Sequence, residues 1–294
     1  MALWITIAKW VIIVMGSFFT GRILLPRLAV LLHEANFTRI NYRGEAIPSG
    51  GGILFLLGTP VWMGIALILG IHHFTIENTF LFIFVIMGMG MVGFFDDVLG
   101  SQDAKGFSGH FGALFRGRLT SGALKALYGG IIATLFSIGL WVLEGQHTNL
   151  PIWLRLYQFF LNIAVIALST NLINLLDLRP GRAGKSYLIA IVIAFFLSKQ
   201  PELFQLAIPL SIILIAYIRA DLKAWIMMGD VGSNLLGGVL GIMIAWTFTP
   251  PSKTVAFILL LSLNLLSERF SFSRIIERFR VLRFLDELGR GRTD

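Results

Sequence analysis

The chain has 294 residues and a net charge of +8; 56% of its residues are hydrophobic, only 14% are charged and none is cysteine. With a mean hydropathy of +0.81, it is far more apolar than an average soluble domain, at roughly 45–50% apolar residues, and this excludes an ordinary soluble protein. The lack of cysteine excludes disulfides and thiolate metal sites.

Apolar runs separated by short polar segments recur along the chain. Many approach the roughly 20 residues that a helix needs to cross a bilayer, so we predict an all-α, polytopic membrane helix bundle with about nine transmembrane helices. The predicted spans lie near residues 3–25, 51–71, 79–98, 122–143, 153–176, 186–199, 203–218, 232–249 and 253–267. We find no internal repeat or linker, and therefore expect one transmembrane domain over residues 1–267 and a cytoplasmic tail over residues 268–294.

The distribution of Lys and Arg predicts the orientation of this bundle. With the N-terminus outside, most of the 24 basic residues fall in the loops and the tail on the cytoplasmic side, where positive residues are retained. The C-terminus is then cytoplasmic, and the protein is a multi-pass protein of the cell membrane. This asymmetry accounts for the net charge, so nucleic-acid binding is not expected.

The segment IPSGGG, residues 47–52, precedes the second span on the cytoplasmic side. Gly51 and Gly52, after Pro48, allow a backbone to approach a ligand closely. The same glycines also suit a hinge or close packing between helices. The segment alone does not choose between these functions.

The segment FFDDVLG ends the third span on two adjacent carboxylates, Asp96 and Asp97. A carboxylate within hydrocarbon costs roughly 2.5–3.5 kcal/mol on insertion scales, but much less at a helix end, so a solvated helix cap is one explanation. The other is metal binding, because Mg²⁺ commonly uses one or two carboxylates together with substrate phosphates. Lys105 and Lys125 follow on the same side and suit further contacts with phosphate oxygens.

The segment NLINLLD ends the fifth span, again on the cytoplasmic side. It places Asn171, Asn174 and Asp177 within about 120° of one helix face. Such polar residues either line a cleft or bond neighbouring helices to each other.

The segment MGDVGS leads into the eighth span, with Asp230 just before it and Gly232 and Ser233 at its start. A helix start of this kind suits phosphate binding, although Asp and Ser also form ordinary capping turns.

All four motifs lie on one side of the predicted membrane. Acidic ligands, amides and glycine-lined helix starts together predict a phosphoryl-transfer site.

The motifs IPSGGG, FFDDVLG, NLINLLD and MGDVGSNLLGG, together with KGFSGHF at residues 105–111, resemble those of the polyprenyl-phosphate N-acetylhexosamine-1-phosphate transferases in order and spacing. That family includes the phospho-N-acetylmuramoyl-pentapeptide translocases and the undecaprenyl-phosphate N-acetylglucosamine-1-phosphate transferases. The resemblance implies a cytoplasmic cleft, Mg²⁺ as cofactor with Mn²⁺ as a substitute, and transfer of a sugar 1-phosphate from a UDP-sugar to a polyprenyl phosphate for cell-envelope glycans. A homodimer is compatible with it.

The resemblance also implies a role for each motif residue. Asp230 is the main metal ligand, and Asp96 and Asp97 engage the lipid phosphate, the metal or both. The residues implied in catalysis are Asp96, Asp97, Asp177 and Asp230, with Asp177 lining the cleft. The residues implied in substrate binding are Asn171, Asn174, Lys125, Lys105, Pro48, Gly51, Gly52, Gly232 and Ser233.

The sequence departs from the family on the nucleotide side. Pro180 stands where a second acid is expected, Ala220 where an Asn contacts uracil, and the tail has no histidine in place of a His-rich loop. A transferase with an altered donor and a catalytically inactive paralogue that binds polyprenyl phosphate both fit. We favour the enzyme, since separated carboxylates near a membrane are costly to retain without a function. A secondary transporter fits less well, because its ionisable groups would lie near the middle of the bilayer.

The tail combines apolar residues at helical spacing with Arg274, Arg278 and Arg280. This pattern predicts a basic amphipathic helix. Such a helix either lies on the inner leaflet among membrane lipids or packs under the bundle.

Overall fold

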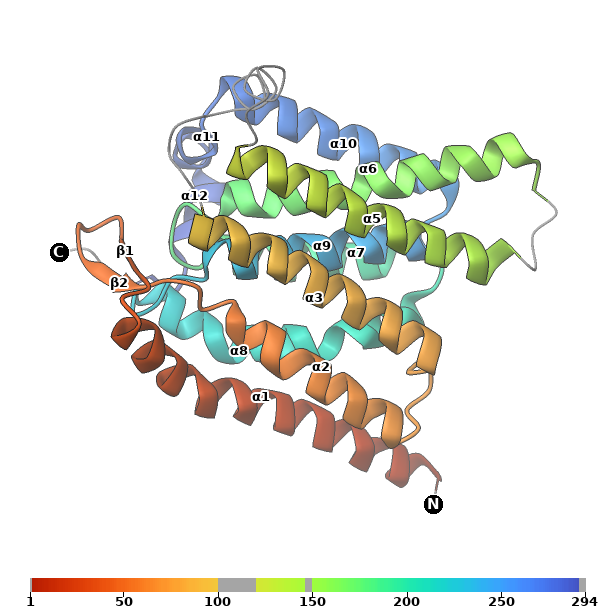
Figure 1. Ribbon diagram of the computed structural model, residues 1–294, viewed down its shortest axis with the longest axis horizontal. Helices are drawn as coiled ribbons and strands as arrows, with labels where there is room; N and C mark the ends of the chain where they lie inside the picture. Colours follow the sequence, from red (N-terminus) through yellow and green to blue (C-terminus); the bar gives the residue numbers. More distant parts are fainter. Residues whose placement is uncertain (1, 100–119, 146–149, 291–294) are drawn as a thin grey trace.

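The computed structural model describes residues 2–99, 120–145 and 150–290, in which long helices lie side by side as a bundle (Figure 1). A hairpin of two short antiparallel strands, with Arg39 paired to Ile47, connects the first two helices. The elements are α1 (Ala2–Glu34), β1 (Thr38–Ile40), β2 (Ala46–Pro48), α2 (Ile53–Ile68), α3 (Ile76–Leu99), α5 (Ser121–Gly145), α6 (Ile152–Leu176), α7 (Arg182–Leu197), the 3₁₀-helix η1 (Pro201–Ala207), α8 (Ile208–Leu222), α9 (Gly229–Thr247), α10 (Pro250–Arg269), α11 (Phe272–Arg278) and α12 (Arg280–Glu287).

Every predicted span coincides with a helix, which confirms the all-helical membrane bundle. Within the described ranges, 7 helical segments are long and apolar enough to cross a membrane, one of them being η1 and α8 together. The helix α2 is apolar but has 16 residues, and α7 also has 16. The number of crossings and the orientation therefore stay predictions.

The helix α9 lies at the centre of the bundle and packs mainly against α3 and α6. All its residues from Val231 to Thr247 are buried. Gly237 and Gly241 make this close packing possible, because an added Cβ would lie 2.5 Å from the Cα of Thr170 and 2.6 Å from the Cα of Ile166, both in α6. Small residues commonly allow such approach in membrane bundles. The start of α9 is thereby placed beside the ends of α3 and α6.

The C-terminal tail forms two short helices, α11 and α12, instead of a single amphipathic helix. Between them Phe279 has an extended backbone with φ −98° and ψ 116°. Both helices lie at the end of the bundle where α3 ends (Figure 1). This end also holds the polar motifs.

Candidate functional site

Polar side chains from four helices meet at the end of the bundle where α3 and α6 end and α5 and α9 begin. The Lys125 ammonium of α5 donates to Asp96 Oδ2 of α3 at 3.0 Å and to Asp230 Oδ2 of α9 at 3.1 Å. The Asn174 amide of α6 donates to Asp230 Oδ1 at 2.8 Å and to Ser233 Oγ at 2.9 Å. Both carboxylate oxygens of Asp230 therefore accept hydrogen bonds, and two carboxylates share one ammonium group.

The carboxylate of Asp97 is directed differently from that of Asp96. Its Oδ2 accepts from the backbone N–H of Val231 at 3.2 Å, and its Oδ1 lies 3.5 Å from Arg39 Nη2. Arg39 also donates to the Asp97 backbone carbonyl at 2.9 Å. Asp97 therefore connects the end of α3 to the first turn of α9 and to the hairpin.

The glycine-rich segment before α2 pairs with the chain that leads into α9. The N–H groups of Gly51 and Gly52 donate to the carbonyls of Met227 and Met228 at 2.9 and 2.8 Å, and the carbonyl of Pro48 accepts from Met227 at 2.8 Å. A side chain at Gly52 would clash with the backbone of Gly232. These glycines thus allow the starts of α2 and α9 to pack closely, which was the alternative to ligand binding. Their contact with substrate stays a prediction.

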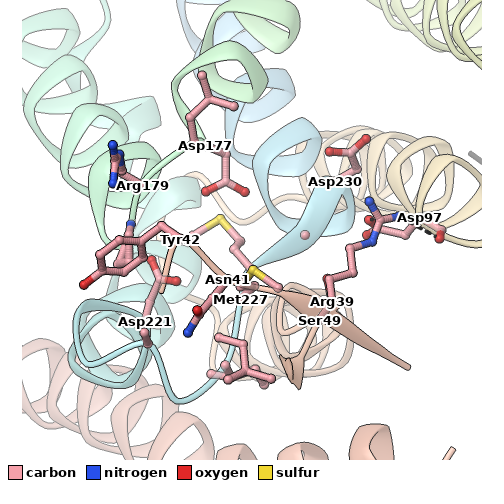
Figure 2. Close-up of a pocket in the computed structure, with 17 residues that line it drawn as sticks. Arg39, Asn41, Tyr42, Ser49, Asp97, Asp177, Arg179, Asp221, Met227 and Asp230 are labelled. Carbon is pink, nitrogen blue, oxygen red and sulfur yellow. Dashed lines mark hydrogen bonds and ion pairs between the residues drawn. The ribbon is translucent and has the colours of Figure 1, made fainter. Parts of the chain in front are cut away.

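A polar cavity of about 200 Å³ adjoins this cluster. Figure 2 shows that Asp97, Asp177, Asp221 and Asp230 reach it from different elements, together with Arg179. Asp221 is only 4% exposed and accepts from the Gly181 N–H at 2.7 Å. Asp177 lies just beyond α6, where burial and then the nearby charge of Asp221 raise the pKa of its carboxyl well above the usual range.

An apolar recess of about 230 Å³ lies between α3 and α5, next to the same cluster. Its lining is mainly hydrophobic, with Asp96 and Lys125 as the charged members. The other lining residues are Val92, Phe95, Leu99, Ser121, Leu124 and Tyr128. The shared ammonium therefore borders the recess, while its partner Asp230 borders the polar cavity.

The sequence profile of glycosyl transferase family 4 matches residues 79–247, which is more than half of the chain. The chain belongs to glycosyl transferase family 4. The matched region contains Asp96, Lys125, Asn174 and Asp230, so the four-helix cluster lies within it.

Curated relatives of this family 4 chain carry the name phospho-N-acetylmuramoyl-pentapeptide-transferase. The Chlamydia caviae protein is 29% identical over 211 residues, covering 66% of this chain and 58% of the relative. The Borreliella burgdorferi protein is 27% identical over 265 residues, covering 78% and 69%. The Thermotoga neapolitana protein is 30% identical over 213 residues, covering 70% and 62%. The chain thus spans less than two thirds of the length of the Chlamydia and Thermotoga relatives.

The structure of the family 4 chain brings most of the predicted site residues together. Asp96, Lys125, Asn174, Asp230 and Ser233 form one network, and Asp97 and Asp177 border the cavity beside it. Their predicted roles in catalysis and binding stay predictions.

Asn171 lies apart from this network, although it belongs to the same motif as Asn174. Its amide donates to Asn264 Oδ1 of α10 at 2.7 Å. It thus bonds two helices, which was the alternative expected for such polar residues. Lys105 and the rest of KGFSGHF lie outside the described residues.

Sequence reasoning missed Arg39 and Asp221 in this family 4 site. Asp221 stands between Arg219 and Lys223, two of the basic residues that predict the orientation of the bundle. The signal that would have found Asp221 is its position, since it follows an apolar span on the same side as Asp177. Arg39 has no comparable signal, because its role depends on the fold of the hairpin.

The described ranges hold no group of three His, Cys, Asp or Glu side chains that would bind a metal alone. Asp96 and Asp230 nevertheless already share a cation, the Lys125 ammonium. Two carboxylates are what Mg²⁺ commonly takes from a protein when substrate phosphates supply further oxygens. The chemistry of this donor set therefore fits a divalent ion that binds together with phosphate.

Proposed function

We propose that this family 4 chain transfers a sugar 1-phosphate from a nucleotide-sugar to a polyprenyl phosphate, giving a polyprenyl-pyrophosphate-sugar and a nucleoside monophosphate. The observation that carries this proposal is the position of the cluster formed by Asp96, Lys125 and Asp230. It lies between an apolar recess and a polar cavity. One reactant of such a reaction is a lipid with a phosphate head, and the other is a soluble, charged molecule, so a site that borders both environments suits them.

The lipid substrate fits the recess between α3 and α5. Hydrophobic side chains such as Val92, Phe95 and Leu124 offer contacts to a prenyl chain. The Lys125 ammonium at this recess supplies a charge-assisted contact for the phosphate head. We therefore assign Lys125 to the lipid phosphate.

The donor fits the polar cavity. Arg39 and Arg179 border it and offer positive charge to a diphosphate, while Asp177 and Asp221 offer acceptors to hydroxyl or N–H groups. We propose a UDP-linked sugar. This assignment rests on the family resemblance and on the curated relatives, whose name specifies a phospho-N-acetylmuramoyl-pentapeptide group.

In the proposed reaction an oxygen of the lipid phosphate attacks the phosphorus bonded to the sugar. A new P–O bond forms, the P–O bond to the nucleoside monophosphate breaks, and the leaving group takes the electron pair. The second pKa of a phosphate monoester is about 6, so little base catalysis is needed at neutral pH. The protein's main contribution is then to position both phosphates and to neutralise their charge.

We propose Mg²⁺, with Mn²⁺ as a substitute, as the cofactor. Asp230 and Asp96 would hold it, and Asp97 stands next to them as the third predicted ligand. When bound, such an ion neutralises the charge of the transferring phosphoryl group. Asn174 keeps the Asp230 carboxylate in a defined orientation through its 2.8 Å hydrogen bond.

The experiment uses purified protein in detergent, a polyprenyl phosphate and a panel of nucleotide-sugars, with Mg²⁺, Mn²⁺ or EDTA. The lipid-pyrophosphate-sugar and the released nucleoside monophosphate are measured. We expect Asp230→Asn and Asp97→Asn to lower turnover by at least roughly 100-fold, as expected when a group that stabilises or orders the transition-state charge is lost. Glu77→Gln, an exposed carboxylate at the opposite end of α3, is the matched control and should keep parental activity.

Three results would contradict the proposal or replace it. Full activity of Asp230→Asn would remove the assigned site. Binding of polyprenyl phosphate without turnover of any donor would favour the inactive paralogue. Solute transport in vesicles, without product, would favour the transporter. Unchanged turnover in EDTA would exclude the divalent ion as cofactor but would leave the proposed transfer reaction standing.

A further inference from the structure

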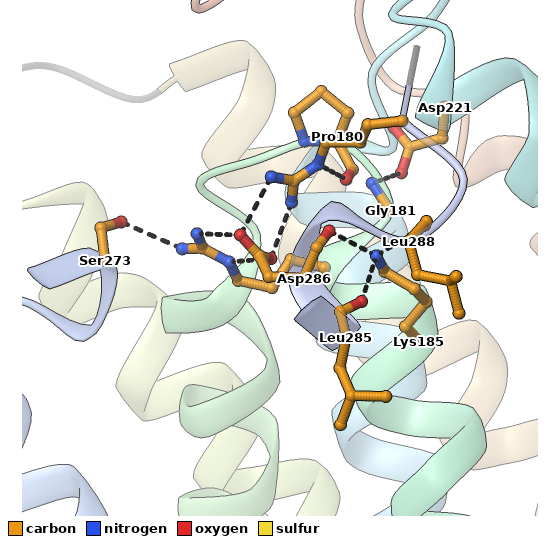
Figure 3. A network of polar contacts seen from close by, with 10 residues as sticks. Pro180, Gly181, Lys185, Asp221, Ser273, Leu285, Asp286 and Leu288 are labelled. Atoms are coloured by element: carbon orange, nitrogen blue, oxygen red, sulfur yellow. Dashed lines mark hydrogen bonds and ion pairs between the residues drawn. The ribbon is translucent and has the colours of Figure 1, made fainter. Parts of the chain in front are cut away.

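Several polar contacts attach the tail to the bundle, and the side chain of Asp286 in α12 lies among them. Asp286 has a side chain that is 9% exposed, whereas its helical neighbours are exposed. Arg182 donates to both its carboxylate oxygens at 2.8 and 2.9 Å, and Arg290 does the same at 2.7 and 2.9 Å. Figure 3 shows the carboxylate between the two guanidinium groups. Bidentate Arg–carboxylate contacts of this kind are strong and fix geometry.

These contacts connect the tail to the chain between α6 and α7. Arg182 is the first residue of α7, and Arg290 Nε donates to the Pro180 carbonyl at 2.8 Å. Lys185, one turn into α7, donates to the carbonyls of Leu285, Asp286 and Leu288 at 2.8, 2.6 and 3.1 Å. The tail thus holds both the end of this connection and the start of the next helix.

The connection between α6 and α7 is a wall of the polar cavity. Asp177, Leu178, Arg179 and Pro180 all line that cavity. Gly181 turns the chain with a φ of +73° and donates its N–H to Asp221 at 2.7 Å. Any movement of Pro180 or Arg182 would therefore displace groups that face the cavity.

We propose that Asp286 is a positioning residue, which acts through Arg182 and Arg290 to hold residues 177–181 in the shape that the nucleotide-sugar donor requires. The donor assignment rests on the proposed function, whereas the restraint of residues 177–181 by Asp286 does not. Asp286 is not among the residues that line the cavity.

The charge state of Asp286 is suited to this task. Burial raises the pKa of its carboxyl, but the hydrogen bonds from Arg182 and Arg290 outweigh burial and lower the pKa to about 2. The carboxylate is therefore ionised throughout the neutral range, and the contact does not depend on cytoplasmic pH.

Hydrogen exchange of the full-length protein, read by mass spectrometry, tests the restraint without any need for turnover. We expect Asp286→Asn to speed amide exchange of residues 178–184 and 280–290 by roughly tenfold, because the connection opens more often once the ion pairs are lost. Glu287→Gln is the matched control: it is the next residue and an exposed acid, and it has one ion pair, with Arg283 at 3.8 Å. Parental exchange in Asp286→Asn would overturn the inference.

Two further variants keep the test decisive if Asp286→Asn does not fold. Asp286→Glu retains the negative charge, so amide exchange of residues 178–184 and 280–290 should stay close to that of the parent. Arg290→Gln removes the contact to Pro180 but leaves the Arg182 pair, and it should speed exchange of residues 178–184 as well. If Arg290→Gln leaves this exchange unchanged, the coupling through Pro180 is wrong.

Steady-state kinetics test the consequence for the donor. We expect Asp286→Asn to raise the donor KM roughly tenfold, with kcat and the KM for polyprenyl phosphate within about twofold of the parent, because misplaced binding groups weaken that substrate. A fall in kcat at constant donor KM would indicate a merely structural role and overturn the proposal. If the parent shows no turnover, the proposed function fails while hydrogen exchange still decides the restraint.

Discussion

Asn174 and Asn171 show how strongly a residue's role depends on its neighbours. Both belong to one motif and lie one helical turn apart, yet Asn174 bonds to Asp230 and Asn171 to Asn264. Helical spacing places residues on a face of their own helix, but it does not say which helix passes that face. The spacing therefore predicted correctly that these residues share a polar face. Only the structure shows that Asn174 belongs to the candidate site and Asn171 to the packing between α6 and α10.

Asp177 permits a prediction about pH. Because burial and the charge of Asp221 raise the pKa of its carboxyl in the native state, the native state binds a proton that the unfolded state releases. Stability then falls as pH rises between the unfolded and native pKa values. We expect Asp177→Asn to have a higher apparent Tm than the parent at about pH 8, and the difference to shrink as the pH falls toward about 5.

Fluorescence-monitored melting in detergent measures this difference. Glu287→Gln, which alters an exposed acid, should show no such trend. If the advantage of Asp177→Asn grew at low pH, the carboxylate would be stabilised in the native state, and the inferred direction of the pKa shift would be wrong.

At the scale of elements, α12 combines its polar attachment with an exposed apolar side. Val281 is 70% exposed and Phe284 63%, while Arg283 lies on the opposite side of the helix from Val281 and Arg280 borders the apolar side one turn before Phe284. Exposed apolar groups next to arginines are typical of helices that lie on an anionic leaflet. The attachment through Asp286 leaves this side free, so the leaflet position stays our prediction for the tail.

Because the chain has no cysteine, single labels can test this position. We expect a fluorophore on Val281→Cys, in nanodiscs with anionic lipid, to be quenched by lipid-borne nitroxide. The same label on Arg283→Cys, about 200° around the helix, should remain accessible to an aqueous quencher. Equal aqueous quenching at both positions would place α12 in water.

The elements themselves were largely predictable, because long apolar runs must form helices in lipid, where every backbone group needs an internal partner. The break at Phe279 and the hairpin before α2 were not. The hairpin residue Pro48 pairs with Met227 and the tail residue Asp286 with Arg182, and both partners are far away in sequence. In the sequence Asp286 has the pattern of an ordinary solvated acid of an amphipathic tail.

At the scale of the whole molecule, cysteine labelling tests the predicted orientation. We predict that His72→Cys, in the loop between α2 and α3, reacts with a membrane-impermeant maleimide in intact cells. Glu287→Cys should react only after the cells are permeabilised, because the positive residues place that end inside. The reverse pattern would put the cluster of Asp96, Lys125 and Asp230 on the outer side, away from cytoplasmic nucleotide-sugars. A homodimer, likewise, stays a prediction.

The central position of α9 also bears on how the chain is made. Synthesis proceeds from the N-terminus, so α3, α5 and α6 leave the ribosome before the helix that carries Asp230 and fills the space between α3 and α6. Lys125, which pairs with Asp96 at 3.0 Å in the folded protein, belongs to this earlier part of the chain. A positive partner for the acidic end of α3 is thus present in the chain before α9 is made.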